Sequence, residues 1–145
     1  MARETAAAAI AVRDGAQGTE VCLVQTGEAW SVPWSLLGKG EIPKQTALRA
    51  LREATGIDAV LPDVDGRYYR TFEQVYRKGI DKVRREVHVY KIKCSAEASG
   101  GTWLPAPEGC AKVTSKSVRE AMEHALGLAK PAPPKVVAEP KFEEV

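Results

Sequence analysis

Two apolar runs near the start of the chain are separated by a short polar stretch. Residues 6–12 and 20–26 are each long enough for a buried strand, and residues 14–19 between them include Gly15 and Gly18. Glycines in a short polar connection are typical of a tight turn between paired strands. The pattern therefore predicts an antiparallel hairpin at the start of the chain.

Helical spacing of apolar residues first appears at residues 46–55, where Leu48 and Leu51 fall on one face. Thr46 stands where an N-cap is expected, because its hydroxyl can accept a hydrogen bond from a free backbone N–H. Gly56 follows the last periodic residue, and glycine commonly ends a helix in the left-handed conformation. We therefore predict a helix that ends at Gly56.

The second half of the chain repeats the change from strand to helix. Residues 66–72 have strand character, and apolar and polar residues come close to alternating at residues 85–94, which together predict two strands. Residues 117–128 have the apolar spacing of an amphipathic helix. The order of the predicted elements indicates an α+β fold, in which a mixed β-sheet is sandwiched between helices.

The chain length and the proline distribution define the expected domain. A length of 145 residues fits one domain, and 44% hydrophobic with 28% charged residues is typical of a globular protein. Four of the nine prolines lie in residues 130–145. Proline removes a backbone donor and restricts the residue before it, so this stretch cannot join a helix or a central strand. We predict a folded domain at residues 1–129 and a proline-rich, disordered tail whose deletion changes stability little.

Composition also indicates the compartment. No apolar run approaches the roughly 20 residues that span a bilayer, so we expect no membrane anchor. The three cysteines, Cys22, Cys94 and Cys110, are widely spaced and odd in number. This pattern offers neither a disulfide framework nor a paired metal-binding motif, and it favours free thiols in a reducing compartment. We therefore expect a cytoplasmic protein.

Positive charge is concentrated in one segment of the chain. The net charge of +2 does not by itself indicate nucleic acid, and the sequence has no specific nucleic-acid motif. Residues 67–93, however, contain nine basic and three acidic residues. Such an excess predicts a surface for an anionic ligand, although a solvated hairpin face is the alternative. The candidate phosphate-binding residues are Arg67, Arg70, Lys82 and Arg84.

Residues 30–57 carry the most informative motif, WSVPWSLLGKGEIPKQTALRALREATGI. In one ungapped register, Glu41, Arg49, Glu53 and Gly56 match the pattern G-x5-E-x7-R-E-U-x-E-E-x-G-U, where U is apolar. The chain therefore resembles the Nudix hydrolase family. The resemblance implies a mixed sheet between helices. It also implies hydrolysis, with Mg²⁺ or Mn²⁺, of the pyrophosphate bond in a nucleoside diphosphate derivative or dinucleoside polyphosphate.

Three box positions differ from the family pattern. Ser35 replaces the first glycine, while Ala50 and Ala54 replace two of the three glutamates on the helix. Positions 50, 53 and 54 are spaced i, i+3 and i+4, so they share one helix face. Three carboxylates there would supply the oxygen ligands that a hard dication requires. In this chain Glu53 is the one that remains.

The resemblance assigns a role to each matching residue. It implies that Glu53 is the catalytic carboxylate and a metal ligand, and that Glu41 is a second metal ligand. Arg49 and Gly56 are implied to be structural. Arg49 can pair with Glu53 four residues later, and Glu41 can reach back to Arg49 from the loop. Such pairs hold a helix and a loop in place and perform no chemistry.

Residues outside the box could complete the site. Glu86, Glu97 and Glu108 are the carboxylates that could replace the missing ligands. Trp30, Trp34 and Trp103 are interpreted as packing residues, and a nucleobase pocket is the alternative for a tryptophan beside the box. Three functions stay open: a Nudix pyrophosphohydrolase, a non-catalytic module that binds a nucleotide or polyphosphate, and a protein-interaction scaffold.

Overall fold

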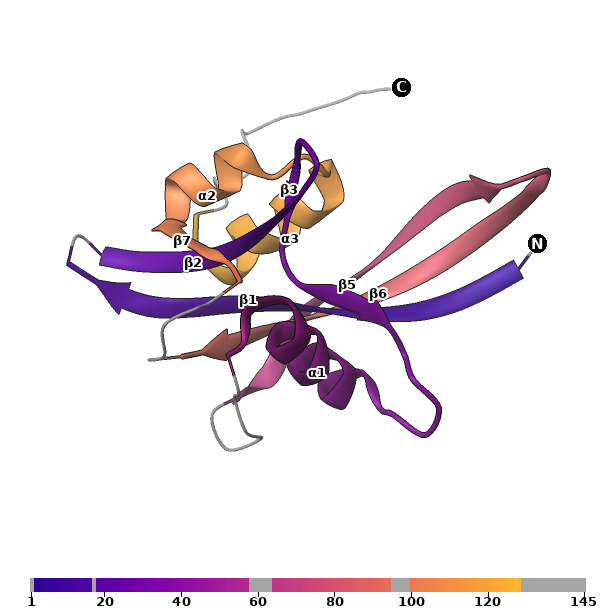
Figure 1. Ribbon diagram of the computed structural model, residues 1–145, viewed down its shortest axis with the longest axis horizontal. Coiled ribbons are helices and arrows are strands. Elements are labelled where there is room, and N and C mark those ends of the chain that lie inside the picture. Colours follow the sequence, from indigo (N-terminus) through magenta and orange to yellow (C-terminus); the bar gives the residue numbers. More distant parts are fainter. Residues whose placement is uncertain (1, 17, 58–63, 95–99, 129–145) are drawn as a thin grey trace, which may run out of the picture.

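A seven-stranded sheet with helices on both faces forms the described part of the chain, shown by a computed structural model in Figure 1. The structure describes residues 2–16, 18–57, 64–94 and 100–128, and of residues 64–69 it describes the backbone alone. The predicted tail at residues 130–145 lies outside this part, so the domain boundary stays a prediction. No helix of the described residues is long and apolar enough to cross a membrane.

Seven strands and three helices follow one another along the described part of the chain. The strands are β1 (Ala2–Gly15), β2 (Gly18–Thr26), β3 (Ala29–Ser31), β4 (Trp34–Leu36), β5 (Val64–Lys78), β6 (Asp81–Lys93) and β7 (Thr102–Pro105). The helices are α1 (Pro43–Thr55), α2 (Ala106–Lys112) and α3 (Lys116–Ala125). The main strand order is β3-β2-β1-β6-β5, while β4 pairs with β1 and β7 with β2. Strand β1 is parallel to β6 and antiparallel to β2 and β4, so the predicted mixed sheet is confirmed.

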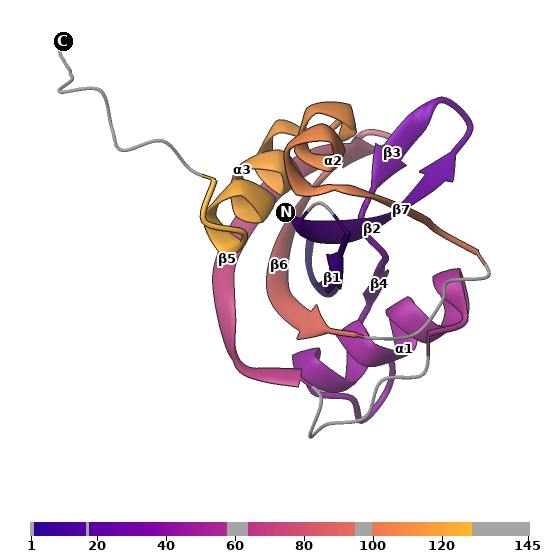
Figure 2. The same ribbon diagram turned by 90° about the vertical axis from the view of Figure 1, so that its left-hand side faces the viewer.

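Strand β1 divides the core into two halves, because successive side chains of a strand point to opposite faces. Ala6, Ala8 and Ile10 belong to a cluster with Met122 of α3, and we call this side of the sheet the α3 face. Ala7, Ala9 and Ala11 belong to a cluster with Ala47 and Leu51 of α1, on the side that we call the α1 face. Figure 2 shows the two sets of helices on opposite sides. The run of small residues in β1 lets helices approach closely from both sides.

The predicted N-terminal hairpin is confirmed, but the N-cap of α1 differs from the prediction. Strands β1 and β2 are paired down to Gly15 and Gly18. Helix α1 begins at Pro43 with Ile42 as its N-cap, and Gln45 Oε1 accepts a hydrogen bond from the Ile42 N–H at 3.1 Å. Thr46 was therefore wrongly predicted as the N-cap. Proline at the first helical position starts the helix one turn earlier, because its fixed φ suits that position.

The later elements are present with different lengths. Strand β5 continues to Lys78 and β6 starts at Asp81, so this hairpin is much longer than predicted. Helix α3 begins after Ser115, whose Oγ accepts from the Val118 N–H at 3.3 Å, and it ends at Ala125. Strands β3, β4 and β7 and helix α2 were not predicted. Elements of three to seven residues are too short to show a period in the sequence.

Candidate functional site

Arg49 is the centre of a hydrogen-bond network between α1 and the loop that precedes it. Its Nε lies 2.8 Å from Glu41 Oε2, and its NH1 lies 3.0 Å from Glu53 Oε1. Its NH2 donates to Ser35 Oγ at 3.2 Å and to the Leu36 carbonyl at 3.0 Å. We call these five residues the Arg49 network. The network fixes the box loop against the helix, as the spacing of the motif predicted.

Glu41 uses its carboxylate oxygens within this loop. Besides Arg49, the Gly38 N–H donates to Glu41 Oε1 at 2.7 Å and the Thr46 hydroxyl donates at 2.9 Å. These hydrogen bonds lower the pKa of Glu41 to about 2, and the bond from Arg49 has the largest effect, followed by those from Gly38 and Thr46. A carboxylate with these donors around it has few lone pairs left for a cation. The contacts indicate that Glu41 anchors the loop.

Gly56 ends the helix as the box implies. Its φ of 79° is in the left-handed region, where an L side chain is strained, and its N–H donates to the Arg52 carbonyl at 2.8 Å. The closing turn brings Ile57 into the cluster on the α1 face. Gly56 therefore acts on the direction of the chain after α1, in agreement with the structural role implied by the motif.

The helix face that carries metal ligands in the family pattern is mostly apolar here. Glu53 is 60% exposed and pairs with Arg49. Ala50 is only 3% exposed, and Ala54 is half-buried. The fold therefore leaves almost no open space at position 50 and some open space at position 54. One carboxylate, already in an ion pair, remains on this face.

The described donors do not fit a firmly held dication. Mg²⁺ requires octahedral oxygen coordination and gives up its hydration water reluctantly. Within residues 2–57, 64–94 and 100–128, apart from Gln17, no group of three or more His, Cys, Asp or Glu side chains could hold a metal ion. Glu86 is exposed on β6 beside His88, at 3.3 Å, and Glu108 is on α2 across the sheet from α1. Glu97 lies outside the described residues.

The candidate phosphate-binding residues lie on two faces of the sheet. Arg70 is opposite Val89, which belongs to the core cluster on the α3 face. Lys82 and Arg84 alternate along β6 with Val87 and Val89 and share the face of Tyr90 and Ile92, so they point to the α1 face. The side chain of Arg67 is not described. The sequence could not separate these residues, because the assignment depends on the register between β5 and β6.

A cavity of about 160 Å³ opens on the α3 face, next to the start of the box. We call it the α3 cavity. Its lining includes Trp34, Phe72, Gln74 and Arg85 from the strands and Val118 from α3. Trp34 is 45% exposed and comes directly before Ser35, whose hydroxyl belongs to the Arg49 network on the other face. Strand β4 therefore carries the cavity on one side and the box loop on the other.

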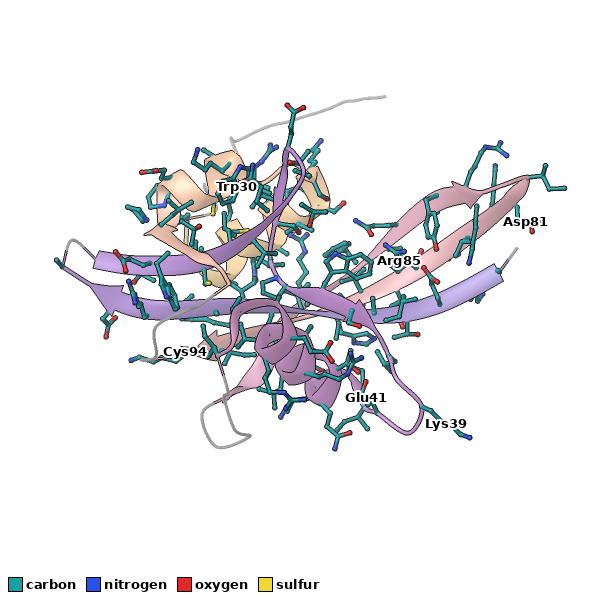
Figure 3. All side chains as sticks on the ribbon, in the orientation of Figure 1. Trp30, Lys39, Glu41, Asp81, Arg85 and Cys94 are labelled. Atoms are coloured by element: carbon teal, nitrogen blue, oxygen red, sulfur yellow. The ribbon has the colours of Figure 1, made fainter. Side chains whose placement is uncertain are left out.

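The wall of the α3 cavity is held by a compact polar cluster. The Arg85 guanidinium carbon lies 4.5 Å from the ring centroid of Trp34 and 4.6 Å from that of Tyr76. Glu4 accepts from Arg85 Nε at 2.8 Å and from the Tyr76 hydroxyl at 2.6 Å. The Tyr76 bond is the largest cause that lowers the pKa of Glu4. These contacts fix Arg85, and Figure 3 shows Arg85 and Glu41 on opposite sides of the sheet.

A family model describing the NUDIX domain matches residues 3–138. The chain belongs to the Nudix family. The mixed sheet and the box predicted from the sequence are thereby confirmed at the level of family and fold. Nudix enzymes generally use a divalent metal, so the replacement of two box glutamates separates this domain from the common pattern.

Solved structures share the fold at low sequence identity. An Ap4A hydrolase from C. elegans aligns with a TM-score of 0.66 and 14% identity, over 86% of this chain and 96% of its own. The E. coli dihydroneopterin triphosphate pyrophosphohydrolase aligns with a TM-score of 0.66 and 19% identity, over 89% and 100%. The NUDIX domain of Shewanella oneidensis NrtR, complexed with ADP ribose, aligns with a TM-score of 0.65 and 18% identity, over 88% of each chain. No curated protein sequence matches significantly.

Few features of the sequence indicated the α3 cavity in this Nudix domain. Trp34 was one of three tryptophans interpreted as packing residues, with a nucleobase pocket as the alternative beside the box, and Arg85 was one basic residue among nine. Trp30 instead packs against the core cluster on the α3 face. The pairing of Trp34 with Ala8 in β4 and β1 determines that Trp34 lies on the α3 face, because directly paired residues share a face of the sheet. That pairing cannot be recognised from a three-residue strand.

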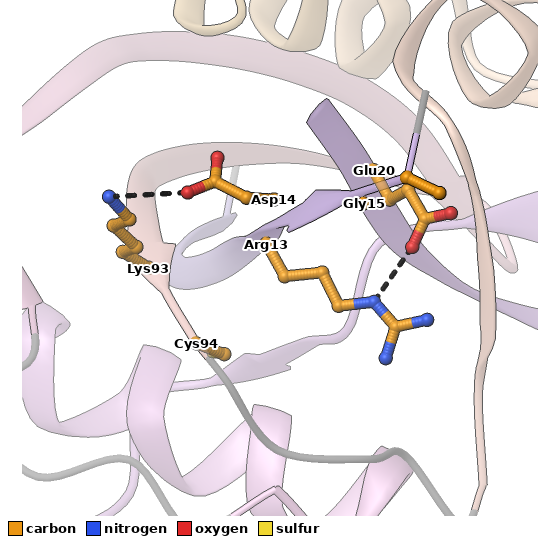
Figure 4. A pocket seen from close by; sticks show the side chains of 7 residues that line it. Arg13, Asp14, Gly15, Glu20, Lys93 and Cys94 are labelled. Carbon is orange, nitrogen blue, oxygen red and sulfur yellow. Dashed lines mark hydrogen bonds and ion pairs between the residues drawn. The ribbon is translucent and has the colours of Figure 1, made fainter. Parts of the chain in front are cut away.

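A second hollow, of about 470 Å³, lies at the far end of the β1–β2 hairpin in this Nudix domain. Figure 4 shows its charged side chains paired with each other. Arg13 lies 2.7 Å from Glu20, and Lys93 lies 3.9 Å from Asp14. The hollow is at the opposite end of the sheet from the box loop (Figure 1), so we do not assign the Nudix ligand to it.

We expect Glu41→Gln to lower the melting temperature at pH 7 by several degrees, since Arg49 loses its main partner. The folded pKa of about 2 lies below the ordinary value of 4.5. The ionised carboxylate therefore stabilises the fold above pH 4.5, and this contribution disappears as the pH falls towards 2. Melting curves from pH 7 to pH 2 should show the wild type and Glu41→Gln converging.

Glu53→Gln is the matched control, because Glu53 is exposed and shares the same arginine. Its melting temperature should stay close to that of the wild type, since exposed ion pairs contribute little. Equal losses in Glu41→Gln and Glu53→Gln at pH 7 would contradict the anchoring role of Glu41.

Proposed function

We propose that this Nudix domain binds a nucleotide that contains a diphosphate group, with its base in the α3 cavity, and hydrolyses it poorly. One observation carries the proposal. The Arg49 network that holds the box loop is complete, while positions 50 and 54 of the same helix are alanines. The fold has kept the frame of the site and lost two of the carboxylates that hold metal in the family pattern.

The α3 cavity supports binding of a planar ring. Pockets for whole ligands commonly exceed about 300 Å³. The α3 cavity, at about 160 Å³, suits one ring system of a larger molecule, and the remainder must lie outside it. Trp34 offers an exposed ring for stacking, and Arg85 and Gln74 offer polar groups. Arg70 lies on the same face two residues from Phe72 and is the predicted phosphate-binding residue best placed for this ligand.

Metal should contribute little to binding. Because Glu41 is committed to the loop and Glu53 is exposed, we expect only weak association of Mg²⁺ or Mn²⁺ with the free protein. A cytoplasmic location stays a prediction. It is supported by Cys22 and Cys110, which are buried thiols outside any disulfide.

A second candidate is a working pyrophosphohydrolase. It is favoured by Glu53, which keeps its place in the box register, and by the two similar structures named as an Ap4A hydrolase and a triphosphate pyrophosphohydrolase. In that case a carboxylate outside the helix face supplies the missing chemistry, with Glu86, Glu97 and Glu108 as the first candidates.

Calorimetric titration with ADP-ribose and Ap4A, each with and without Mn²⁺, distinguishes the two candidates when product release is followed in parallel. The proposal expects heat of binding without metal and little or no release of product. Efficient Mg²⁺-dependent cleavage that disappears in Glu53→Gln would establish the hydrolase instead. If neither ADP-ribose nor Ap4A binds, the proposed ligand class is wrong.

Trp34→Ala should weaken binding of the tighter of these ligands about 5- to 150-fold, the range expected from the loss of about 1–3 kcal/mol of base stacking. Ile80→Ala serves as the control, because Ile80 is an exposed apolar residue in the turn between β5 and β6 and is not among the lining residues. Titration calorimetry gives both affinities. If the two variants bind equally well, the ring does not bind in the α3 cavity.

A further inference from the structure

At one end of the sheet three strands extend past α1 and α3 (Figure 1), and Gln74 and Arg85 at the base of this extension still line the α3 cavity. The three strand segments are residues 2–4 of β1, 74–78 of β5 and 81–85 of β6, and we call them the arm. Strand β6 lies in the middle, paired with β1 on one side and β5 on the other. The register assigns every arm side chain to the α3 face or to the α1 face.

On the α3 face of the arm, each cation is opposite a group that balances it. Lys78 faces Asp81 across the hairpin. Arg85 faces Glu4 across β1 and β6, and its Nε lies 2.8 Å from that carboxylate. This is the arrangement expected for a self-sufficient protein surface, because opposite charges across a pair of strands stabilise the sheet.

On the α1 face of the arm, cations are opposite cations. Arg77 faces Lys82, and Arg84 faces Arg3. Like charges directly opposite each other destabilise a sheet. We call these four residues the basic ladder. Its cost is not offset by strong ion pairs within the described residues, where Arg84 lies 3.8 Å from Glu73 in an exposed contact.

Arg84 is also incompletely hydrogen-bonded within the described residues. Its Nε is buried and has no hydrogen-bond partner among the described residues. A guanidinium carries several donors in a fixed plane and is suited to phosphate oxygens. The Arg84 side chain as a whole is 37% exposed, so an anion at the surface would be bound through its terminal guanidinium nitrogens and would relieve the repulsion between the paired cations.

We propose that the basic ladder binds the phosphate backbone of a double-stranded nucleic acid. The two rows of cations are two residues apart along the strands, or about 6.6–6.8 Å, so they form a regular ladder of charge. Beyond Ala2, which pairs with Val83, the described tip of the arm consists of β5 and β6 alone, and a two-stranded β-ribbon is thin enough to enter the major groove of DNA. Ile80, in the turn at the tip of the arm, is 93% exposed and would meet the duplex first.

The composition of this face favours nucleic acid over an acidic protein. The buried centre of a protein–protein interface is largely apolar, whereas interfaces with nucleic acid are polar and positively charged. Beside the four cations, the described part of the arm's α1 face has one exposed large apolar side chain, Val75. This face therefore lacks the apolar centre of a protein–protein interface. The next row along the strands holds Glu73 opposite Glu86, which ends the ladder after two rows.

The contact is therefore short and does not distinguish sequences. Four cations can neutralise at most four phosphates, and each released counterion contributes about −0.9 to the slope of log K against log salt concentration. We expect a slope of about −3 to −4. The ladder does not line the α3 cavity, so this inference is independent of the proposed nucleotide function.

Fluorescence anisotropy with labelled duplexes of about 20 base pairs, one of DNA and one of RNA, tests the proposal between about 50 and 200 mM KCl. The combined Arg77→Gln and Lys82→Gln substitutions should weaken binding about tenfold or more at the lower salt concentration. Lys78→Gln with Lys116→Gln is the matched control, because it removes the same charge from the opposite face of the arm and from α3. The control should bind as the wild type does.

Four results would overturn the proposal. They are no binding of either duplex at the lower salt concentration, equal weakening in the ladder variant and the control, equally tight binding of poly-glutamate, and self-association of the wild type that the ladder variant abolishes. A difference between the two duplexes identifies DNA or RNA as the partner. The circular dichroism spectrum and the melting temperature of the ladder variant should match those of the wild type, which shows that the variant is folded.

Discussion

Leu51→Ala is expected to lower the free energy of unfolding by about 2–5 kcal/mol, the usual range for a buried leucine. Leu51 is fully buried, and its cluster includes Ala7, Ala9 and Ala11 of the central strand. Alanine side chains have no rotamers with which to fill a new cavity, so the cost should fall in the upper half of this range. Chemical denaturation followed by circular dichroism measures the change.

Leu48→Ala is the comparison, since Leu48 is the same residue type on the same helix but is only half-buried at the edge of this cluster. It should cost clearly less than Leu51→Ala, because less apolar area leaves water when the wild type folds. A larger cost for Leu48→Ala would mean that α1 is rotated about its axis relative to the sheet.

Restoring the glutamate at position 50 should have the second large effect. Ala50 is 3% exposed, so Ala50→Glu would bury a carboxylate in the space that the fold has closed. Desolvation shifts the pKa of a fully buried carboxylate by up to 3–5 units, and a rise of three units costs about 3 kcal/mol at pH 7, where part of the carboxyl is already protonated. We expect a cost near this size in metal-free buffer, measured by denaturation.

Ala54→Glu should behave differently, because Ala54 is half-buried and Glu53 beside it is exposed. Stability should change little, and Mn²⁺ affinity should rise, since two neighbouring carboxylates offer more oxygen ligands than one. Calorimetric titration of Mn²⁺ measures the gain. If Ala50→Glu is as stable as Ala54→Glu without metal, the helix face is open and the box can be rebuilt by these two changes alone.

Sequence spacing alone was enough to predict the box frame. Glu41, Arg49 and Glu53 lie in one network because an i, i+4 pair shares a helix face and the loop is too short to carry Glu41 far away. Gly56 was predictable for a similar reason, since few other residues adopt a positive φ at a helix end. Local constraints of this kind survive almost any tertiary arrangement.

The replacement of two carboxylates was also visible in the sequence, but its consequence was not. The letters show alanine at positions 50 and 54. Only the packing of α1 on the sheet makes position 50 closed and position 54 partly open. Glu41 likewise matched a ligand position in the motif, and the donors from Gly38 and Thr46 that occupy it come from the folded loop.

The sequence by itself determined the family, the hairpin at the start, the box helix and the excess of positive charge in residues 67–93. The tertiary structure alone decided where those charges point. Arg70 faces the side of the sheet that carries the α3 cavity, whereas Lys82 and Arg84 join Arg3 on the other side. The physical reason is the two-residue period of a strand, since a shift of one residue in register moves every side chain to the opposite face.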